Sequence, residues 1–201
     1  MAGMRSQQAW VMFNPEAGYR YLAGQPGLGG TRLAAKRPLF VAFLLGCAVS
    51  LITSGTLTLR LVLPSMIYWG LLPLIQAAAL TAVCWSERRR VSIPRTIDSF
   101  FAGYGPWSLW LIGISAIWSF LSPLNRSIES TLSTTWFFGG AGAVIIWSAY
   151  LDFCFFRFVL DKSRKDALRN LLVQRLISWS VIVFILGAPA AWEETVGRYL
   201  L

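Results

Sequence analysis

The sequence predicts an all-α integral membrane protein with five transmembrane helices, and two observations carry this prediction. The first is composition: the 201 residues are 56% hydrophobic and 13% charged, with a mean hydropathy of +0.57. A soluble domain carries about 25% charged residues, so this chain has too little polar surface for a water-exposed globule. The second is charge pattern: fifteen of the eighteen Lys and Arg residues fall in three stretches separated by pairs of long apolar segments.

Five apolar segments are long enough for a hydrocarbon core about 30 Å thick, which requires about 20 helical residues. The third is short, and it becomes adequate if residues 97–104 continue into it or lie along the membrane interface beside it. Ile97, Phe100 and Phe101 recur at i, i+3 and i+4, which favours a short interfacial helix there. The five predicted spans are residues 39–59, 63–85, 106–121, 135–160 and 171–192.

The basic residues give the orientation. By the positive-inside rule, the side that carries most Lys and Arg in its connections faces the cytoplasm. The N-terminus is therefore predicted in the cytoplasm and the C-terminus outside, as an odd number of spans requires. We expect the loop residues of this side to contact lipid head groups, in particular Arg88, Arg89, Arg90, Lys162, Arg164 and Lys165.

The chain divides into a cytoplasmic amphipathic leader, residues 1–37, and a five-helix transmembrane domain, residues 38–201. Within the leader, Asn14-Pro15-Glu16 combines a helix N-cap, a proline at the first helical position and an acid in the first turn. We expect a helix of about two turns to follow, lying on the inner membrane surface with its tyrosines toward lipid or protein.

Asp152 is the one acid deep within an apolar segment. An isolated acid at the centre of a membrane helix costs about 2.5–3.5 kcal/mol, so it should be paired or protonated. Helical rise along the predicted spans places Gln76, Asp152 and Arg175 in one layer of the inner half. We therefore predict an Asp152–Arg175 ion pair, with Gln76 or a serine, Ser50 or Ser148, nearby. The pair could be a polar clamp between helices or a proton- or ion-coupling site.

Two further features concern helix geometry. Pro73 lies in the middle of the second span, three residues after Gly70, and predicts a helix kink because proline removes one backbone hydrogen bond. Gly139, Gly140 and Gly142 allow a neighbouring helix to approach the fourth span closely, within the chain or in a dimer.

Several function classes find no support in the residues. The chain has no histidine, three dispersed cysteines and no CxxC, so we expect no metal site and no cofactor. No GxSxG, Walker A or HExxH motif is present, and we expect no enzymatic activity. The basic residues lie in short loops between spans rather than along one aqueous face, so nucleic acid is not an expected partner.

The leader segment Asn14-Pro15-Glu16-Ala-Gly-Tyr-Arg-Tyr-Leu and the Arg37-Pro38 pair before the first span resemble bacterial Yip1-domain proteins. Tyr104-Gly105-Pro106 is similar to the YGP of the eukaryotic motif, although its acidic-leucine partner is missing and it precedes the third span. The resemblance implies a five-span helical membrane protein without known catalysis. Eukaryotic relatives bind small GTPases, a role that does not carry over to a chain of bacterial style.

The function expected from these observations is non-enzymatic organisation of protein partners or lipids in the bacterial inner membrane. Two alternatives stay open. One is an accessory subunit of a larger membrane complex, with other membrane subunits as partners. The other is a small transporter or channel that uses the layer around Asp152.

Overall fold

The computed structural model describes residues 9–24, 31–86, 92–121 and 126–195, and every regular element in these ranges is helical. Five helical segments are long and apolar enough to cross a membrane, which confirms the predicted number of spans. They run over Lys36–Ser54, Leu59–Ser86, Ile93–Ile117, Phe138–Val159 and Arg164–Ile185.

The helices follow one another with short connections. The chain order is α2 (Pro15–Gly24), α3 (Thr31–Ser54), α4 (Leu59–Trp69), α5 (Leu71–Ser86), α6 (Ile93–Phe101), the 3-10 turn η1 (Ala102–Tyr104), α7 (Gly105–Leu121), α8 (Arg126–Cys154), the π-helix η2 (Phe155–Val159) and α9 (Arg164–Thr195). One further helical stretch, residues 9–13, precedes α2.

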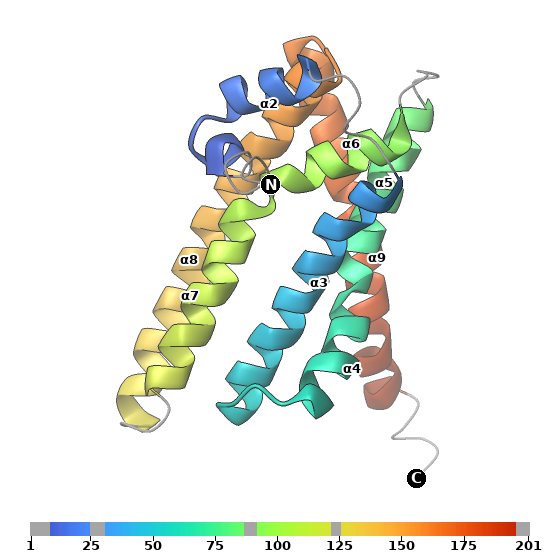
Figure 1. The fold of residues 1–201 in the computed structure, drawn as a ribbon. Coiled ribbons are helices and arrows are strands. Elements are labelled where there is room, and N and C mark those ends of the chain that lie inside the picture. Colours follow the sequence, from blue (N-terminus) through green and yellow to red (C-terminus); the bar gives the residue numbers. More distant parts are fainter. Residues whose placement is uncertain (1–8, 25–30, 87–91, 122–125, 196–201) are drawn as a thin grey trace.

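The predicted span boundaries need two corrections. The first span ends at Ser54 rather than at residue 59, because Ser54 is followed by Gly55 in a left-handed conformation (φ 68°) that turns the chain into α4. It also starts earlier, since α3 begins at Thr31 and contains Pro38. The third span is extended by α6 and η1, as its short apolar segment requires; Figure 1 shows α6 lying across the bundle and α7 running down it.

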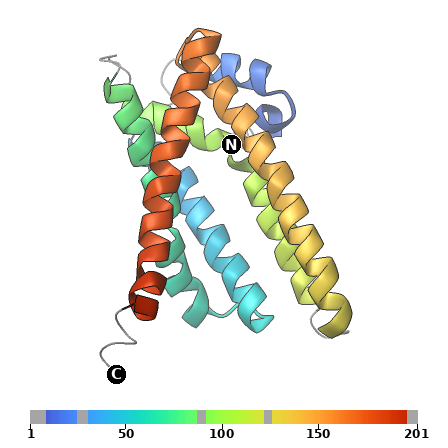
Figure 2. The ribbon, with the colours of Figure 1, turned by 180° about the vertical axis from the view of Figure 1, so that it is seen from behind.

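The molecule has two different ends. At the upper end in Figures 1 and 2, α2 and α6 lie across the ends of the long helices, beside η2 and the α8–α9 connection. We call this end the head and define it as α2, α6, η1, η2 and the adjoining ends of α5, α8 and α9. The opposite end, called the far end below, carries the α3–α4 turn at Gly55, the end of α7, the start of α8 and the end of α9.

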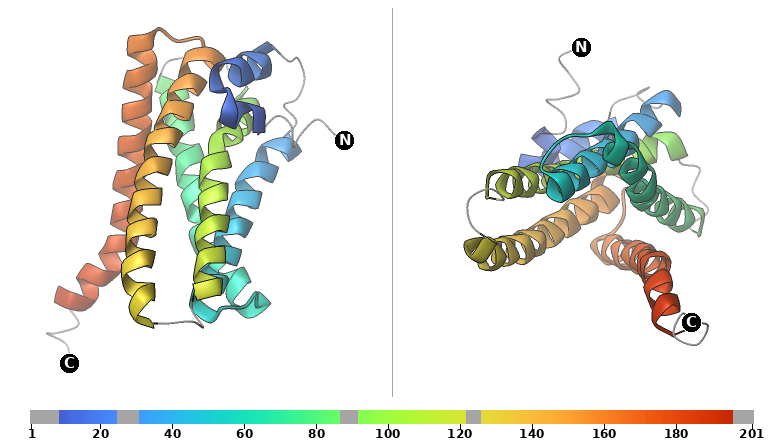
Figure 3. Two further views of the ribbon diagram at one scale, coloured as in Figure 1. Left: turned by 90° about the vertical axis from the view of Figure 1, so that its left-hand side faces the viewer. Right: turned by 90° about the horizontal axis from the view of Figure 1, so that it is seen from below.

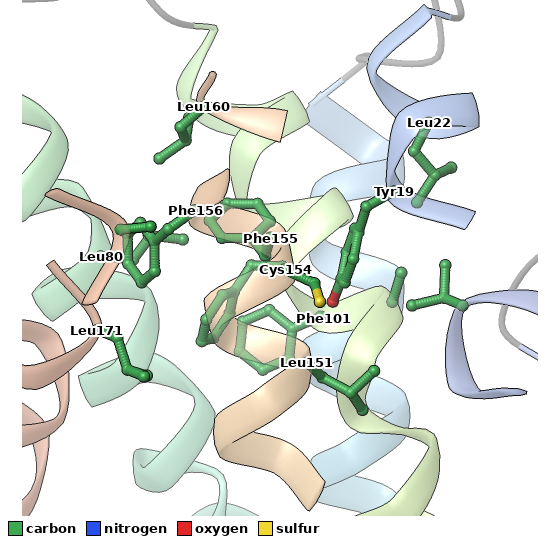
Figure 4. Packing of buried hydrophobic residues seen from close by; sticks show 14 of the residues in the cluster. Tyr19, Leu22, Leu80, Phe101, Leu151, Cys154, Phe155, Phe156, Leu160 and Leu171 are labelled. Atoms are coloured by element: carbon green, nitrogen blue, oxygen red, sulfur yellow. The ribbon is translucent and has the colours of Figure 1, made fainter. Parts of the chain in front are cut away.

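The head contains the main hydrophobic core. Its largest fully buried side chains are aromatic, and they come from three separate parts of the sequence: Tyr19, Phe100, Phe101, Phe155 and Phe156. The Phe155 ring lies at the centre, with ring centroids 5.9 Å from Tyr19 and 5.3 Å from Phe100 and from Phe156. Figure 4 shows Tyr19 reaching from α2 toward Phe155 and Cys154.

The leader helix forms as its sequence predicts. α2 begins at Pro15, and the Asn14 Oδ1 accepts a hydrogen bond from the Ala17 backbone N–H at 3.3 Å, which is the expected N-cap. The tyrosines divide between two environments: Tyr19 is completely buried in the head, whereas Tyr21 is 43% exposed beside the Trp10 ring. The leader is therefore part of the folded core and not only a surface attachment.

The spans are packed less completely than the head. Between 28% and 39% of each span window is buried inside the molecule, so most of its side chains face outward, as they do in a bundle surrounded by lipid. α8 and α9 approach each other at the head and diverge toward the far end, as Figures 2 and 3 both show. The long helices are thus held together mainly from one end.

Two predicted helix features have a place in this arrangement. α4 and α5 are separated at Gly70, and Pro73 follows in the first turn of α5, where its ring nitrogen cannot donate to the Trp69 carbonyl. Gly140 serves a contact within the chain, because a Cβ there would lie 2.8 Å from Nε1 of Trp110 on α7. Gly139 and Gly142 face open space.

Candidate functional site

The strongest candidate site is the ion pair between α8 and α9. Arg175 donates from Nη2 and Nε to Asp152 Oδ2, at 2.8 Å and 3.2 Å, so the predicted pair is present in the structure. The side chains are 13% exposed for Asp152 and 21% for Arg175. In such a setting, removing one partner leaves an uncompensated charge and costs about 3–5 kcal/mol.

The connection between the two helices sets this geometry. α8 passes into the π-helix η2, the chain reverses at Asp161 (φ 48°), and α9 begins at Arg164. Ser163 caps α9, since its Oγ accepts from the Asp166 backbone N–H at 3.1 Å and contacts Asp166 Oδ2 at 2.7 Å. This short, capped reversal makes α8 and α9 antiparallel neighbours and fixes the register that brings Asp152 to Arg175.

A serine completes the pair. Arg175 Nη2 also donates to Ser148 Oγ at 2.9 Å, and Ser148 lies one helical turn before Asp152. Of the two serines proposed from the sequence, Ser148 is therefore the one at the pair. Ser50 lies near the end of α3 instead, where its Oγ donates to the Thr56 carbonyl and accepts from the Thr58 backbone N–H.

Gln76 belongs to the same layer without bonding to the pair. It lines a small cavity of about 30 Å³ together with Ser148, Asp152 and Arg175. Its Oε1 is buried and has no hydrogen-bond partner. An unsatisfied buried acceptor costs about 1–3 kcal/mol, so the buried oxygen of this amide lowers the stability of the fold.

Sequence analysis did not identify Gln174, which lines the same cavity. Gln174 is 2% exposed, and its Nε2 donates to Ser178 Oγ at 3.2 Å. Because the Ser178 hydroxyl donates its own proton to the Gln174 backbone carbonyl (2.8 Å), it can only accept from the amide, which fixes the amide orientation. Gln174 Oε1 is left buried without a partner. Gln174 could have been identified from the sequence, because it is a polar residue next to Arg175 within an apolar segment.

An aromatic chamber adjoins this polar layer. The cavity measures about 250 Å³ and is lined by four tryptophans from three spans: Trp69, Trp107, Trp110 and Trp179. Gln76, Tyr104, Trp107 and Trp179 line both cavities, so the polar layer closes one side of the chamber. Trp179 is nevertheless 46% exposed, which places an edge of the chamber at the surface of the bundle.

A second buried ion pair joins α3 to α6 of the head, at an arginine for which the charge pattern predicted only a role in orientation. Arg37 is 6% exposed; its Nη1 donates to the Asp98 carbonyl at 2.6 Å and lies 3.3 Å from Asp98 Oδ2. Arg95 donates from Nη2 to the carbonyls of Leu22 and Ala23, at 3.1 Å and 2.8 Å, and so caps the C-terminus of α2. Basic residues of the predicted cytoplasmic side thus hold the head together.

The structure describes only some of the basic residues that were predicted to contact lipid head groups. Arg164 and Lys165 are exposed at the start of α9 and Lys162 is half-buried just before it, whereas Arg88, Arg89 and Arg90 lie outside the described residues. Arg157 of η2 donates to the Lys162 carbonyl, so it ties the reversal to η2. Across residues 9–24, 31–86, 92–121 and 126–195, no group of three or more His, Cys, Asp or Glu is placed to hold a metal ion.

Tyr19 is the titratable group that the head buries most completely. Burial raises the pKa of its phenol well above the ordinary value, and the Asp152 carboxylate raises it further. Its hydroxyl has no hydrogen-bond partner and lies against Gly103, where a Cβ would clash with it. The phenol therefore fills space in the core as an uncharged group.

Comparisons with protein-family models, with curated proteins and with solved structures found no match to this chain.

Proposed function

We propose that this chain is a non-enzymatic, Yip1-like membrane protein of the bacterial inner membrane that organises lipids through its head. The observation that carries the proposal is the position of the core: the large buried aromatic side chains lie in the head, and not midway along the spans. A rigid head at one end of a loosely packed bundle suits a protein that presents a fixed surface to the membrane interface.

The surface of the head has the composition that anionic interfaces attract. Arg164 and Lys165 are exposed there, and so is Arg20, whose guanidinium is paired with Glu16; we call these three residues the basic face. Two exposed aromatic side chains also lie in the leader, Trp10 with 42% and Phe13 with 77% of its surface exposed. Basic residues favour anionic lipid head groups, and tryptophan favours the level of the head groups. By the positive-inside rule this end faces the cytoplasm.

The Asp152–Arg175 pair supports a structural role in this proposal. Arg175 makes three hydrogen bonds, two to Asp152 and one to Ser148, so the two charges already neutralise each other. A clamp of this kind fixes how α8 and α9 meet directly beneath the head. It thereby holds the basic residues at the start of α9 in place.

The test is to purify the tagged chain in a mild detergent and to quantify co-purified lipids by mass spectrometry. Each basic residue near an anionic surface contributes about 1 kcal/mol, or about fivefold in affinity. We expect Arg164→Gln with Lys165→Gln to lower the enrichment of anionic lipids strongly. The matched control, Arg60→Gln with Arg126→Gln, changes two charges at the opposite end of the molecule.

Three outcomes distinguish the alternatives. Equal loss of anionic lipid in both double variants contradicts lipid organisation by the head. A second protein recovered in stoichiometric amount would favour an accessory subunit. A pH-dependent flux in vesicles that Asp152→Asn abolishes would favour a transporter and contradict the purely structural role of the pair.

A further inference from the structure

The chamber between α3, α5, α7 and α9 combines an apolar body with one polar wall. Its tryptophans offer flat apolar surfaces, while Gln76 and Tyr104 belong both to this chamber and to the small polar cavity beside it. Because the two cavities share lining residues, we treat them as one site with an apolar part and a polar part. Such a site fits an amphipathic molecule rather than a wholly polar or wholly apolar one.

The polar part requires hydrogen-bond donors. Gln76 Oε1 and Gln174 Oε1 are both acceptors, both are buried, and neither has a partner. The orientation of the Gln174 amide follows from its bond to Ser178, so its unpaired oxygen is not interchangeable with the amide nitrogen. Asp152 and Arg175 satisfy each other. The wall therefore presents two acceptors that need donors, and the charge of Arg175 is already paired with Asp152.

The size of the polar part limits the head group. A cavity of about 10–15 Å³ holds one water molecule, and the polar cavity measures about 30 Å³. This is room for one or two groups the size of a hydroxyl and too little for a phosphate or a sugar. The chamber beside it, about 250 Å³, accommodates part of an alkyl chain, and the half-exposed Trp179 marks where the chain continues into the surrounding lipid.

We propose that this chamber binds an uncharged, hydroxyl-headed membrane lipid, whose hydroxyl donates its one proton to Gln174 Oε1 or to Gln76 Oε1 and whose chain lies among Trp107, Trp110 and Trp179. This site is separate from the basic face, so it can fail while the proposed function holds, and the reverse.

The test uses the full chain in phosphocholine nanodiscs and two photoreactive probes. The first probe is hexadecan-1-ol with a mid-chain diazirine; the second is its methyl ether, which has the same chain but no donor. Irradiation and mass spectrometry then map the adducts. We expect the alcohol to label α7 and α9 about tenfold more than the ether, the factor typical of one hydrogen bond to a buried acceptor.

Two kinds of variant test separately the hydrogen bond to the glutamines and the volume of the chamber. Removing the acceptor that the hydroxyl uses, by Gln174→Leu or by Gln76→Leu, should bring the labelling by the alcohol down toward that by the ether, and the double variant should do so whichever acceptor is used. Leu45→Phe with Leu111→Phe fills the chamber without touching either glutamine and should abolish labelling by both probes. Because the two glutamines lie on different helices, misfolding of one variant leaves the other as a test.

Two results would overturn the inference. Equal labelling of the wild type by alcohol and ether would mean that the polar cavity holds water only. Labelling that persists after the chamber is filled would place the probe elsewhere on the lipid-facing surface. Neither result bears on lipid enrichment at the basic face, which the charge variants test separately.

Discussion

The head and the far end of the molecule are held together by different forces. In the head, Tyr19, Phe100 and Phe155 come from distant parts of the sequence and leave 0–2% of their surfaces exposed. Toward the far end α8 and α9 diverge (Figure 3), and large side chains such as Phe138 and Phe184 are 69% and 74% exposed. One end resembles the core of a soluble domain, and the other resembles separate helices in lipid.

The environment explains this difference. Between helices in a bilayer there is little hydrophobic driving force, because lipid chains are as apolar as the side chains they would replace. At the interface, burying an aromatic ring removes it from water and contributes fully. With the head at the membrane interface, as proposed above, a bundle that closes at this end gains more stability per buried residue than one that closes at its middle.

The largest expected effect is the loss of an aromatic side chain from the head. Phe155→Ala should lower the free energy of unfolding by about 3–5 kcal/mol, because it leaves a cavity among Tyr19, Phe100 and Phe156. The matched control is Phe138→Ala on the same long helical segment, which should change it by about 0.5 kcal/mol or less. Equilibrium unfolding in mixed micelles measures both, and equal losses would remove the distinction between the two ends.

The second prediction concerns the ion pair beneath the head. Arg175→Leu should lower the free energy of unfolding by about 3 kcal/mol, because Asp152 is left buried without its partner and must stay charged or take up a proton, either of which costs free energy. Asp152→Leu in combination with Arg175→Leu should recover most of this loss, since an apolar pair needs no compensation. The same unfolding measurement applies to each variant.

An exposed ion pair provides the comparison. Near the start of α9, Arg169 Nη2 lies 3.3 Å from Asp166 Oδ1, and 64% of the Arg169 side chain is exposed. Arg169→Leu should therefore cost at most about 1 kcal/mol. If the Arg175 variant proved no more costly than the Arg169 variant, the clamp would contribute little to stability.

Much of the bundle could be predicted from the sequence because membrane spans are a matter of length and hydropathy. The pairing of Asp152 with Arg175 could be predicted as well. The rise per residue gives the depth of each side chain in the membrane, and a short connection makes the two helices antiparallel neighbours with a fixed register. Asn14-Pro15-Glu16 predicted the start of α2 for a comparable reason: capping is local.

The packing of the head could not be predicted in this way. Arg37 and Arg95 were assigned only an orienting role, because a count of charges does not distinguish a lipid-facing arginine from one that caps a helix far away in the sequence. Gln174 was missed because hydropathy averages over a single polar residue. The aromatic chamber depends on how four spans meet, and no pattern within one span encodes that.

The third prediction tests whether the leader is fastened by Arg95. Arg95→Leu removes two hydrogen bonds to the end of α2, and we expect a loss of about 1–2 kcal/mol that is concentrated in the leader. Hydrogen exchange should become faster in residues 15–24 before the spans are affected. The control is Arg60→Leu at the far end; faster exchange of the leader in that variant would contradict the assignment.

The smallest effect is expected at Tyr19, where the head buries a hydroxyl without a partner. Tyr19→Phe keeps the ring against Phe155 and removes the unsatisfied group. At neutral pH it should therefore leave the stability unchanged or raise it by about 1 kcal/mol, unlike the other head substitutions. Tyr21→Phe, at a tyrosine that is 43% exposed, is the control and should have no effect.

The same pair of variants has a pH dependence with a definite sign. Burial raises the pKa of the Tyr19 phenol well above its ordinary value, so the folded protein keeps the proton when the unfolded chain has lost it. The protonated Tyr19 phenol contributes to the free energy of unfolding in full below a pH of about 10, the ordinary pKa of tyrosine. This contribution is lost as the pH rises from there toward the raised pKa of the folded protein. Unfolding measured between neutral pH and pH 11 should show a shallower alkaline decline for Tyr19→Phe than for Tyr21→Phe. Parallel declines in the two variants would mean that the head lets water reach Tyr19, and the contrast with the far end would then rest on packing alone.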